Sequence, residues 1–194
     1  MKAHVEIYSD YVCPYCVLFE AVLNQASRDL DITVDWKQVE LRPYPNATLR
    51  PEDDYLPDAW KRSVYPLAES LNIALKLPSI SPQPYSRLAH EGYRFAEVAG
   101  RAAEYNAAVF KAFFQDDRDI GDVEVLTTIA ASIGLEQNEF RTALESGKFT
   151  SAHNAALAEA AELGVHSVPS VYINGQPLPL TYDADALRSL LAGN

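Results

Sequence analysis

Two cysteines, Cys13 and Cys16, are the residues of this chain whose type and spacing point most directly to chemistry. They are the only cysteines among 194 residues, and Pro14 and Tyr15 stand between them. Two thiols at this spacing can close into a disulfide and open again by exchange with a substrate disulfide. A Cys-x-x-Cys pair near a strand–helix–strand pattern is typical of redox motifs. The pair therefore predicts thiol–disulfide chemistry.

The position of this pair, where a strand gives way to a helix, predicts different roles for the two thiols. The first turn of a helix carries free N–H groups and a partial positive charge, which should stabilise the thiolate of Cys13. Pro14 suits the first helical position because proline has no N–H to leave unpaired. Cys16 lies one turn further on. We therefore expect Cys13 to be the nucleophile and Cys16 to resolve its mixed disulfide.

Two other interpretations of the cysteines are open. A structural zinc site needs four ligands, usually from two such pairs, and this chain has one pair and four scattered histidines. We expect no metal site, although the reduced thiols could take up an adventitious ion. The other interpretation is that both cysteines are structural and share one helix face. The positive helix N-terminus at Cys13 would then stabilise no thiolate.

The elements around the pair follow from the spacing of apolar residues. Residues 4–9 alternate apolar and polar side chains, which predicts a strand, and residues 32–41 alternate again. Between them the helical period from Val17 onward predicts a helix that runs to about Leu30. A strand–helix–strand connection of this length should be parallel and right-handed.

The middle of the chain has little strand propensity. Prolines punctuate its first part, and apolar side chains at helical spacing over 85–99 predict an amphipathic helix. Asp122 is expected to cap a further helix that ends at Gly134, and another begins near Gln137. The segment is expected to hold four or five helices.

Strand patterns return near the end of the chain. Thr150 is expected to cap a helix that runs through Leu163, and residues 165–173 are rich in β-formers. Asn174-Gly175 is a strong hairpin signal. The returning strand, 176–180, contains two prolines that cannot donate to a ladder, so it should lie at the edge of the sheet.

The order of these elements predicts a fold. Asp183 is expected to cap a final helix, so the order is β-α-β, a helical block, and then α-β-β-α. This is an α/β thioredoxin fold, a central mixed β-sheet flanked by helices, with an all-helical insertion after its second strand. We expect residues 1–45 and 148–194 to form the thioredoxin-like domain and residues 46–147 the helical insertion domain.

Composition excludes several classes of partner. The 16 basic and 27 acidic residues give a net charge of −11, which repels nucleic acid and anionic membranes. No apolar run approaches the roughly 18 residues of a membrane-spanning helix. Polar residues Glu6, Ser9 and Asp10 interrupt the apolar core that a secretory signal would need. We therefore expect a cytoplasmic protein.

Two segments carry a family resemblance, the stretch Ser9 to Cys16 around the cysteines and the stretch Gly164 to Gly175. They resemble the two signatures of the DsbA-like thioredoxin-fold oxidoreductases. The helical block resembles more narrowly the cytoplasmic FrnE-type branch, although Pro-Tyr stands where that branch more usually has Pro-Trp. The resemblance implies a cis-Pro169 beside the cysteines. It also implies a substrate-binding surface made by Pro14, Tyr15, Val168 and Pro169.

The predicted function is thiol–disulfide oxidoreductase, acting on protein or small-molecule disulfides. No cofactor is expected beyond the dithiol itself, and glutathione is a candidate reductant or substrate. One alternative is a glutathione-dependent transferase or isomerase of the kappa or hydroxychromene-carboxylate isomerase type, which usually carries serine at the position of Cys13 and needs no resolving thiol. Another is a non-enzymatic holdase or interaction module.

Other polar residues near the motif carry weaker signals. The carboxylates Asp10, Glu20 and Glu40 are expected to be solvated at the surface. His90 is expected to be a core or surface histidine without a catalytic role. His166 lies three residues before Pro169 and is a candidate neighbour of the cysteines.

Overall fold

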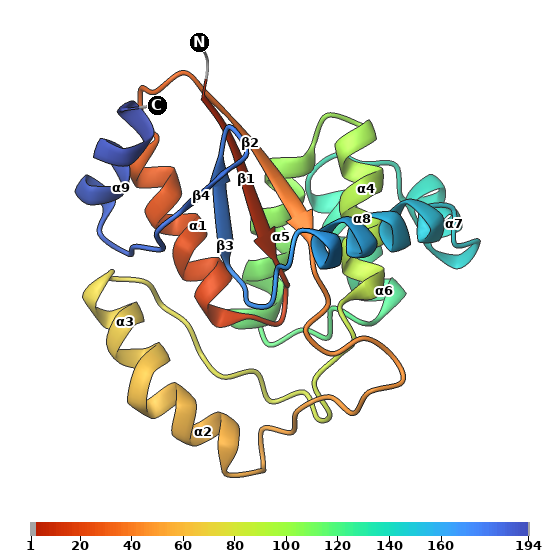
Figure 1. Cartoon of the computed structure of the whole chain (residues 1–194). Helices are drawn as coiled ribbons and strands as arrows, with labels where there is room; N and C mark the ends of the chain where they lie inside the picture. Colours follow the sequence, from red (N-terminus) through yellow and green to blue (C-terminus); the bar gives the residue numbers. More distant parts are fainter. Residues whose placement is uncertain (1–2, 194) are drawn as a thin grey trace.

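A four-stranded mixed sheet forms the centre of the computed structural model, which describes residues 3–193 (Figure 1). Its order is β2-β1-β3-β4. The strands are β1 (Ala3–Ser9), β2 (Ile32–Gln38), β3 (Ser170–Ile173) and β4 (Gln176–Leu178). β1 runs parallel to β2 and antiparallel to β3, and β4 returns antiparallel from β3. The α/β fold with a mixed sheet flanked by helices is confirmed.

The sheet follows the sequence pattern at its centre and departs from it at its ends. β4 lies at the edge, as its prolines require, and Pro177 stands opposite Tyr172. The β-rich stretch 165–173 forms a strand only from Ser170 onward. Tyr8 of β1 pairs with Ser170, and β1 ends at the next residue. Residues 165–169 therefore have no partner strand and form a loop.

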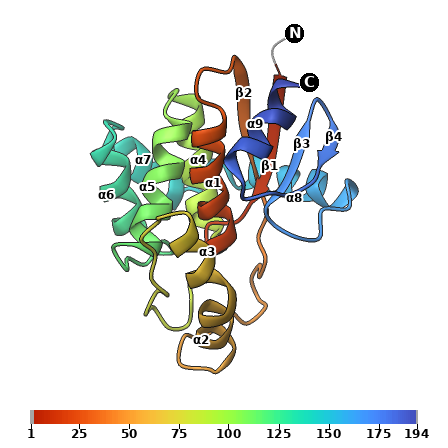
Figure 2. The same ribbon diagram turned by 90° about the vertical axis from the view of Figure 1, so that its left-hand side faces the viewer.

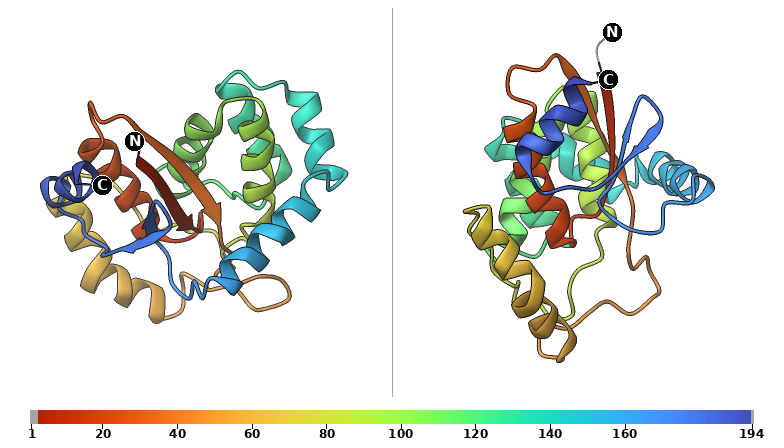
Figure 3. Two further views of the ribbon diagram at one scale, coloured as in Figure 1. Left: turned by 45° about the horizontal axis from the view of Figure 1, so that its top comes forward. Right: turned by 60° about the vertical axis from the view of Figure 1, so that its left-hand side comes forward.

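Helices cover both faces of the sheet. α1 (Pro14–Ala26) and α9 (Ala184–Ala192) pack side by side on one face, and α8 (Thr150–Glu162) packs beside β2 on the other (Figure 2 and Figure 3). α1 ends earlier than predicted, because Asp29 takes a left-handed conformation with φ of 62°.

The predicted helix caps are mostly right. Asp122 accepts the backbone N–H of Glu124, and Asp183 accepts that of Asp185. Thr150 is the exception, because it is the first residue of α8 rather than its cap. Its hydroxyl donates instead to the buried Glu91 carboxylate, at 2.9 Å.

The segment between β2 and α8 is helical, as expected. α2 (Tyr55–Ala59), a π-helical turn η1 (Trp60–Val64) and α3 (Tyr65–Ser70) follow one another as one helical arm, residues 55–70. The remaining helices are α4 (Arg87–Val98), α5 (Ala102–Phe114), α6 (Val123–Ser132) and α7 (Gln137–Glu145). The arm lies beyond the N-terminal end of α1 (Figure 1 and Figure 2).

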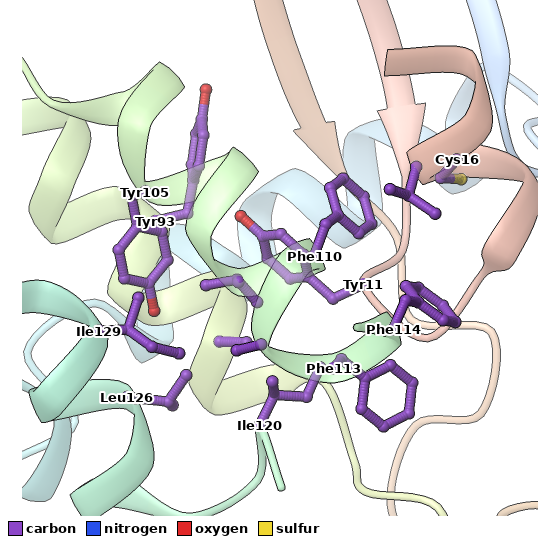
Figure 4. Packing of buried hydrophobic residues seen from close by; sticks show 14 of the residues in the cluster. Tyr11, Cys16, Tyr93, Tyr105, Phe110, Phe113, Phe114, Ile120, Leu126 and Ile129 are labelled. Atoms are coloured by element: carbon purple, nitrogen blue, oxygen red, sulfur yellow. The ribbon is translucent and has the colours of Figure 1, made fainter. Parts of the chain in front are cut away.

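The main hydrophobic core joins the helical segment to the cysteine helix (Figure 4). Cys16 and Tyr11 belong to the same buried cluster as Phe110 and Phe114 of α5. The Tyr11 ring contacts the edge of Phe110, with 5.1 Å between centroids. The helical segment therefore shares a core with the cysteine helix α1, and the division into two domains stays a prediction.

Gly92, in the middle of α4, marks the closest approach within this core. A Cβ added there would overlap the Tyr105 hydroxyl and lie 2.8 Å from Cζ of Phe140, and both side chains are fully buried. We expect Gly92→Ala to destabilise the fold by about 1–3 kcal/mol, despite the helix propensity of alanine. Urea unfolding measures the difference.

The matched control for this change is Gly193→Ala, where the added Cβ would make an ordinary contact of 3.4 Å with the Ser189 carbonyl. That variant should change the unfolding free energy by less than about 0.5 kcal/mol. Equal stability of Gly92→Ala and the unmodified protein would contradict the packing described.

Among residues 3–193, no helix is both long enough and apolar enough to cross a bilayer.

Candidate active site

Cys13 occupies the N-cap of α1, at the point where β1 gives way to the helix. Its backbone is extended, with φ of −94° and ψ of 113°, and Pro14 follows as the first helical residue. The Cys13 N–H donates to the Asp10 carbonyl at 3.0 Å, which closes the turn. The sulfur therefore lies at the positive end of the helix dipole.

Cys16 lies behind Cys13 and is fully buried. Burial raises the pKa of the Cys16 thiol well above its ordinary value, and the hydrogen-bonded Cys13 raises it further. The Ser9 side chain and the Asp10 backbone oppose this rise by hydrogen-bonding to the sulfur. Both cysteines are free thiols. The two thiols thus have unlike environments, one at a pocket and one in the core.

The loop before β3 reaches the active-site turn from the other end of the chain. The Val168–Pro169 peptide bond is cis, and Pro169 is buried. The Cys13 thiol lies 3.6 Å from the Val168 carbonyl and donates to it. The structure therefore brings these residues together, whereas their part in substrate binding stays a prediction.

A pocket of about 360 Å³ opens in front of Cys13. Cys13, Pro14, Tyr15 and Val168 all line it, so four of the predicted site residues share one cavity. The other two predicted site residues, Cys16 and Pro169, are buried and do not line the pocket. His166 is exposed and lines its rim.

The helical arm supplies one wall of this pocket. A wall from the helical block was expected, but the sequence interpretation did not name its residues. Leu56, Trp60 and Val64 line the pocket, and with Ala68 they form a buried row. Their spacing of four residues is the signal that could have revealed them, because it places one apolar stripe along a helix. Prolines within and beside the arm disfavour a helix prediction, so this spacing was not interpreted as a helix.

Tyr15 links the active-site turn to two distant segments. Its hydroxyl lies 2.7 Å from Oγ of Ser63 in the arm, and its carbonyl accepts the Tyr182 hydroxyl at 3.2 Å. Burial raises the pKa of Tyr182, and the nearby Cys16 and Cys13 raise it further. Tyr182 therefore lies near the two thiols, and no sequence motif predicted this position.

Asp10 is buried rather than solvated, so the prediction of a surface carboxylate is wrong. The Leu41 N–H donates to its Oδ2 at 2.7 Å, and Nε2 of His90 lies 3.4 Å from its Oδ1. His90 is a core histidine, as expected, and Nε2 also lies 3.1 Å from the Val39 carbonyl. The Asp10 carboxylate therefore holds residue 41 against the active-site turn.

Glu40 is also buried, because α4 and α8 cover the end of β2. Its Oε1 lies 2.6 Å from Nε2 of His153 and 3.3 Å from Nη2 of Arg87. The His153 ring stacks on His90 at 5.5 Å, and its Nδ1 contacts Oε1 of Gln38 at 3.0 Å. Burial lowers the pKa of His153, although the Glu40 hydrogen bond opposes this.

Glu20 is the third carboxylate whose environment the sequence did not reveal. Burial raises its pKa to about 7, although a 2.7 Å hydrogen bond from the Asn106 amide opposes the rise. A raised carboxyl pKa means that the unfolded chain ionises first as pH increases. Stability from this group is complete below about pH 4.5 and is lost as pH rises towards 7.

We therefore expect Glu20→Gln to stabilise the protein at pH 8 by about 2–3 kcal/mol, and to have almost no effect at pH 4. Urea unfolding at the two pH values measures this. Glu162→Gln, on an exposed part of α8, is the control. It should leave the difference in unfolding free energy between pH 4 and pH 8 unchanged. A Glu20→Gln effect that is equal at both pH values would contradict a half-buried carboxyl with a raised pKa.

Within the described residues 3–193, no group of three or more His, Cys, Asp or Glu side chains is placed to hold a metal ion.

A cysteine at a helix N-terminus, a second thiol behind it and a cis-proline loop across it define the class of thioredoxin-fold thiol proteins. The chain belongs to the DSBA-like thioredoxin domain family, whose model matches residues 4–192. It is 39% identical over 197 residues to the uncharacterized protein YwbO of Bacillus subtilis (strain 168), covering 99% of this chain and 97% of that one. The expected family is thereby confirmed, and proteins of this family generally need no cofactor.

Solved structures share the fold. The probable DsbA oxidoreductase SCO1869 from Streptomyces coelicolor has a TM-score of 0.78 at 21% identity, covering 98% of this chain and 90% of that one. A 2-hydroxychromene-2-carboxylate isomerase has a TM-score of 0.77 at 21% identity, covering 98% and 93%. The cytosolic disulfide reductase DsbM from Pseudomonas aeruginosa with GSH has a TM-score of 0.76 at 16% identity, covering 98% of each chain.

Proposed function

We propose that this protein is a thiol–disulfide oxidoreductase of the FrnE-type branch, with Cys13 as nucleophile and Cys16 as resolving thiol. The observation that carries the proposal is the position of Cys13, at the N-cap of α1 and in the lining of a pocket, with Cys16 buried one turn behind it. Membership of the DSBA-like family supports it.

The reaction proceeds by two exchanges. The Cys13 thiolate attacks one sulfur of a substrate disulfide, the substrate S–S bond breaks, and the leaving thiolate takes up a proton. Cys16 then loses its proton, and its thiolate attacks the Cys13 sulfur. The second substrate thiol leaves, and the Cys13–Cys16 disulfide remains. The substrate gains two electrons and the protein loses two. Two molecules of a thiol such as glutathione can return the Cys13–Cys16 disulfide to the dithiol, and they leave as a disulfide.

Burial of Cys16 suits this order of events. Its raised pKa keeps it protonated while Cys13 reacts, so the two thiols do not compete for one substrate. The Val168 carbonyl beside the Cys13 sulfur, together with Pro14 and Tyr15, provides the surface against which the substrate backbone or body lies. The cytoplasm is the proposed compartment, and the likeness to the cytosolic DsbM supports it.

A redox titration in glutathione buffers, read by alkylation and mass, tests the proposal. The expected result is a reversible two-electron transition of the Cys13–Cys16 pair between about −150 and −270 mV. Its midpoint decides whether the protein acts as oxidant or reductant. A pair that never forms the disulfide but binds one glutathione tightly would overturn the proposal and favour the glutathione-dependent isomerase. Binding of unfolded chains that survives loss of both cysteines would favour a holdase.

A further inference from the structure

The pocket in front of Cys13 leads to a cysteine that is almost closed off from solvent. Cys13 is only 5% exposed. The Val168 carbonyl lies on one side of the sulfur, at 3.6 Å. On another side the contact between Tyr15 and Ser63 joins the active-site turn to the helical arm, residues 55–70. A disulfide held in the surface of a folded protein should therefore reach the sulfur less readily than the disulfide of a small molecule.

The walls of this pocket are largely apolar. Leu56 and Trp60 are buried, and their side chains form the pocket wall provided by the arm. Trp60 is held in place by Phe114, with 5.9 Å between ring centroids. The other apolar lining residues are Val12, Leu41, Leu49, Tyr55, Ala59, Val64 and Pro84. An apolar group beside a substrate disulfide would therefore lose its contact with water here, which favours its binding.

Charged groups contribute little to the lining. Asp10 is fully buried, and its carboxylate is already bonded to the Leu41 N–H. Arg42 is exposed at the rim. The chain as a whole carries a net charge of −11, which repels highly anionic substrates. A polar, multiply charged disulfide gains less from this pocket than a neutral apolar one.

The size of the pocket limits what it can hold. Its volume of about 360 Å³ lies at the lower end of small-ligand sites. That space accommodates a ring-sized group and its linker, whereas a polypeptide segment would extend beyond it. Size and lining together favour a small molecule.

We propose that the physiological substrates are low-molecular-weight disulfides that carry an apolar, ring-sized group next to the S–S bond. The proposal rests on the thiol–disulfide exchange proposed above and specifies its substrate class. The ring lies against Leu56 and Trp60 while Cys13 attacks the nearer sulfur. The two electrons pass from the protein dithiol to the disulfide, and two substrate thiols leave.

The test compares two disulfides of equal chemical reactivity. The symmetric disulfides of N-acetylcysteine benzylamide and N-acetylcysteine methylamide differ by one phenyl ring on each half and have the same reacting sulfur. Reduced protein is mixed with an excess of each, and the rate of Cys13–Cys16 disulfide formation is followed by alkylation and mass. We expect the second-order rate constant to be about 10- to 100-fold larger for the benzylamide. Insulin, a protein with disulfides, should react more slowly than either.

Variants that fill the pocket test whether the preference for the ring-bearing disulfide arises in this pocket. Ala59→Phe, on the arm, should reduce the ratio of the two rate constants towards one, and Thr48→Phe, on the opposite loop, should do the same. Ala107→Phe is the matched control, because Ala107 is exposed on α5 and does not line the pocket. It should keep the ratio.

The outcomes separate this proposal from the one on which it rests. A ratio near one in the unmodified protein would overturn the substrate class and leave the oxidoreductase intact. Insulin reacting as fast as the benzylamide would overturn it in favour of protein substrates. If none of the disulfides oxidises the Cys13–Cys16 pair, the proposed oxidoreductase function itself falls.

Discussion

Replacing Cys13 with alanine is expected to lower the rate of catalysed disulfide exchange by about 10⁴-fold, to near the uncatalysed background. Cys13 is the thiol that lines the pocket and lies at the N-terminal end of α1. Cys16 cannot take its place, because it is fully buried and burial raises its pKa. The measurement is the steady-state reduction of a small disulfide with glutathione as the reductant.

Replacing Cys16 with serine should give a different result, and this contrast makes the assignment specific. The Cys13 thiolate still attacks, but no thiol stands behind it to release the product. A mixed disulfide of about one substrate per chain should therefore accumulate, visible by mass and reversed by added thiol. Accumulation on the Cys13→Ala variant instead would reverse the roles of the two cysteines. Equal loss of reaction in both variants, with no trapped adduct, would argue against a resolving thiol.

Replacing Glu40 with alanine is expected to lower the free energy of unfolding by about 3–5 kcal/mol. Glu40 lies 2.6 Å from His153, which is fully buried, and 3.3 Å from Arg87. Removing the carboxylate leaves Nε2 of His153 without its partner where water cannot replace it, whereas Arg87, about one-third exposed, keeps its hydrogen bond to Asn154. Urea unfolding at pH 7 measures the loss, and Glu40→Gln should lose less because its amide oxygen still accepts a hydrogen bond.

An exposed ion pair provides the control for this prediction. Glu104 pairs with Arg101 on α5, three residues apart, and both side chains are about half exposed. Water and salt screen such a pair, so Glu104→Ala should change stability little. Similar losses from Glu40→Ala and Glu104→Ala would contradict the burial of the Glu40–His153 pair.

The active-site turn was predictable because its determinants are local. The alternation in β1, the proline after Cys13 and the helical period of α1 all lie within one stretch of chain. The same holds for the capping residues Asp122 and Asp183, whose side chains bond backbone groups two positions ahead. The hairpin at Asn174-Gly175 likewise needs only its own residues. At these positions the backbone geometry depends on neighbours in sequence, and the prediction and the structure agree.

The three carboxylates show where local reasoning fails. Asp10, Glu20 and Glu40 look like surface residues, because acidic side chains are mostly solvated. Each is covered by a segment at least 30 positions away in the chain. Leu41 bonds Asp10, Asn106 bonds Glu20 and His153 bonds Glu40.

The amino-acid sequence by itself therefore determined the fold class, the cysteine pair and its place at a helix N-terminus. Only the tertiary structure decided which residues surround that pair. The pocket wall of Leu56 and Trp60 comes from the helical arm, and the Val168 carbonyl comes from 155 positions beyond Cys13. Strand and helix periodicities record which face of an element is apolar, whereas the partner of that face depends on how all the elements pack. The pocket in front of Cys13 is therefore a product of that packing.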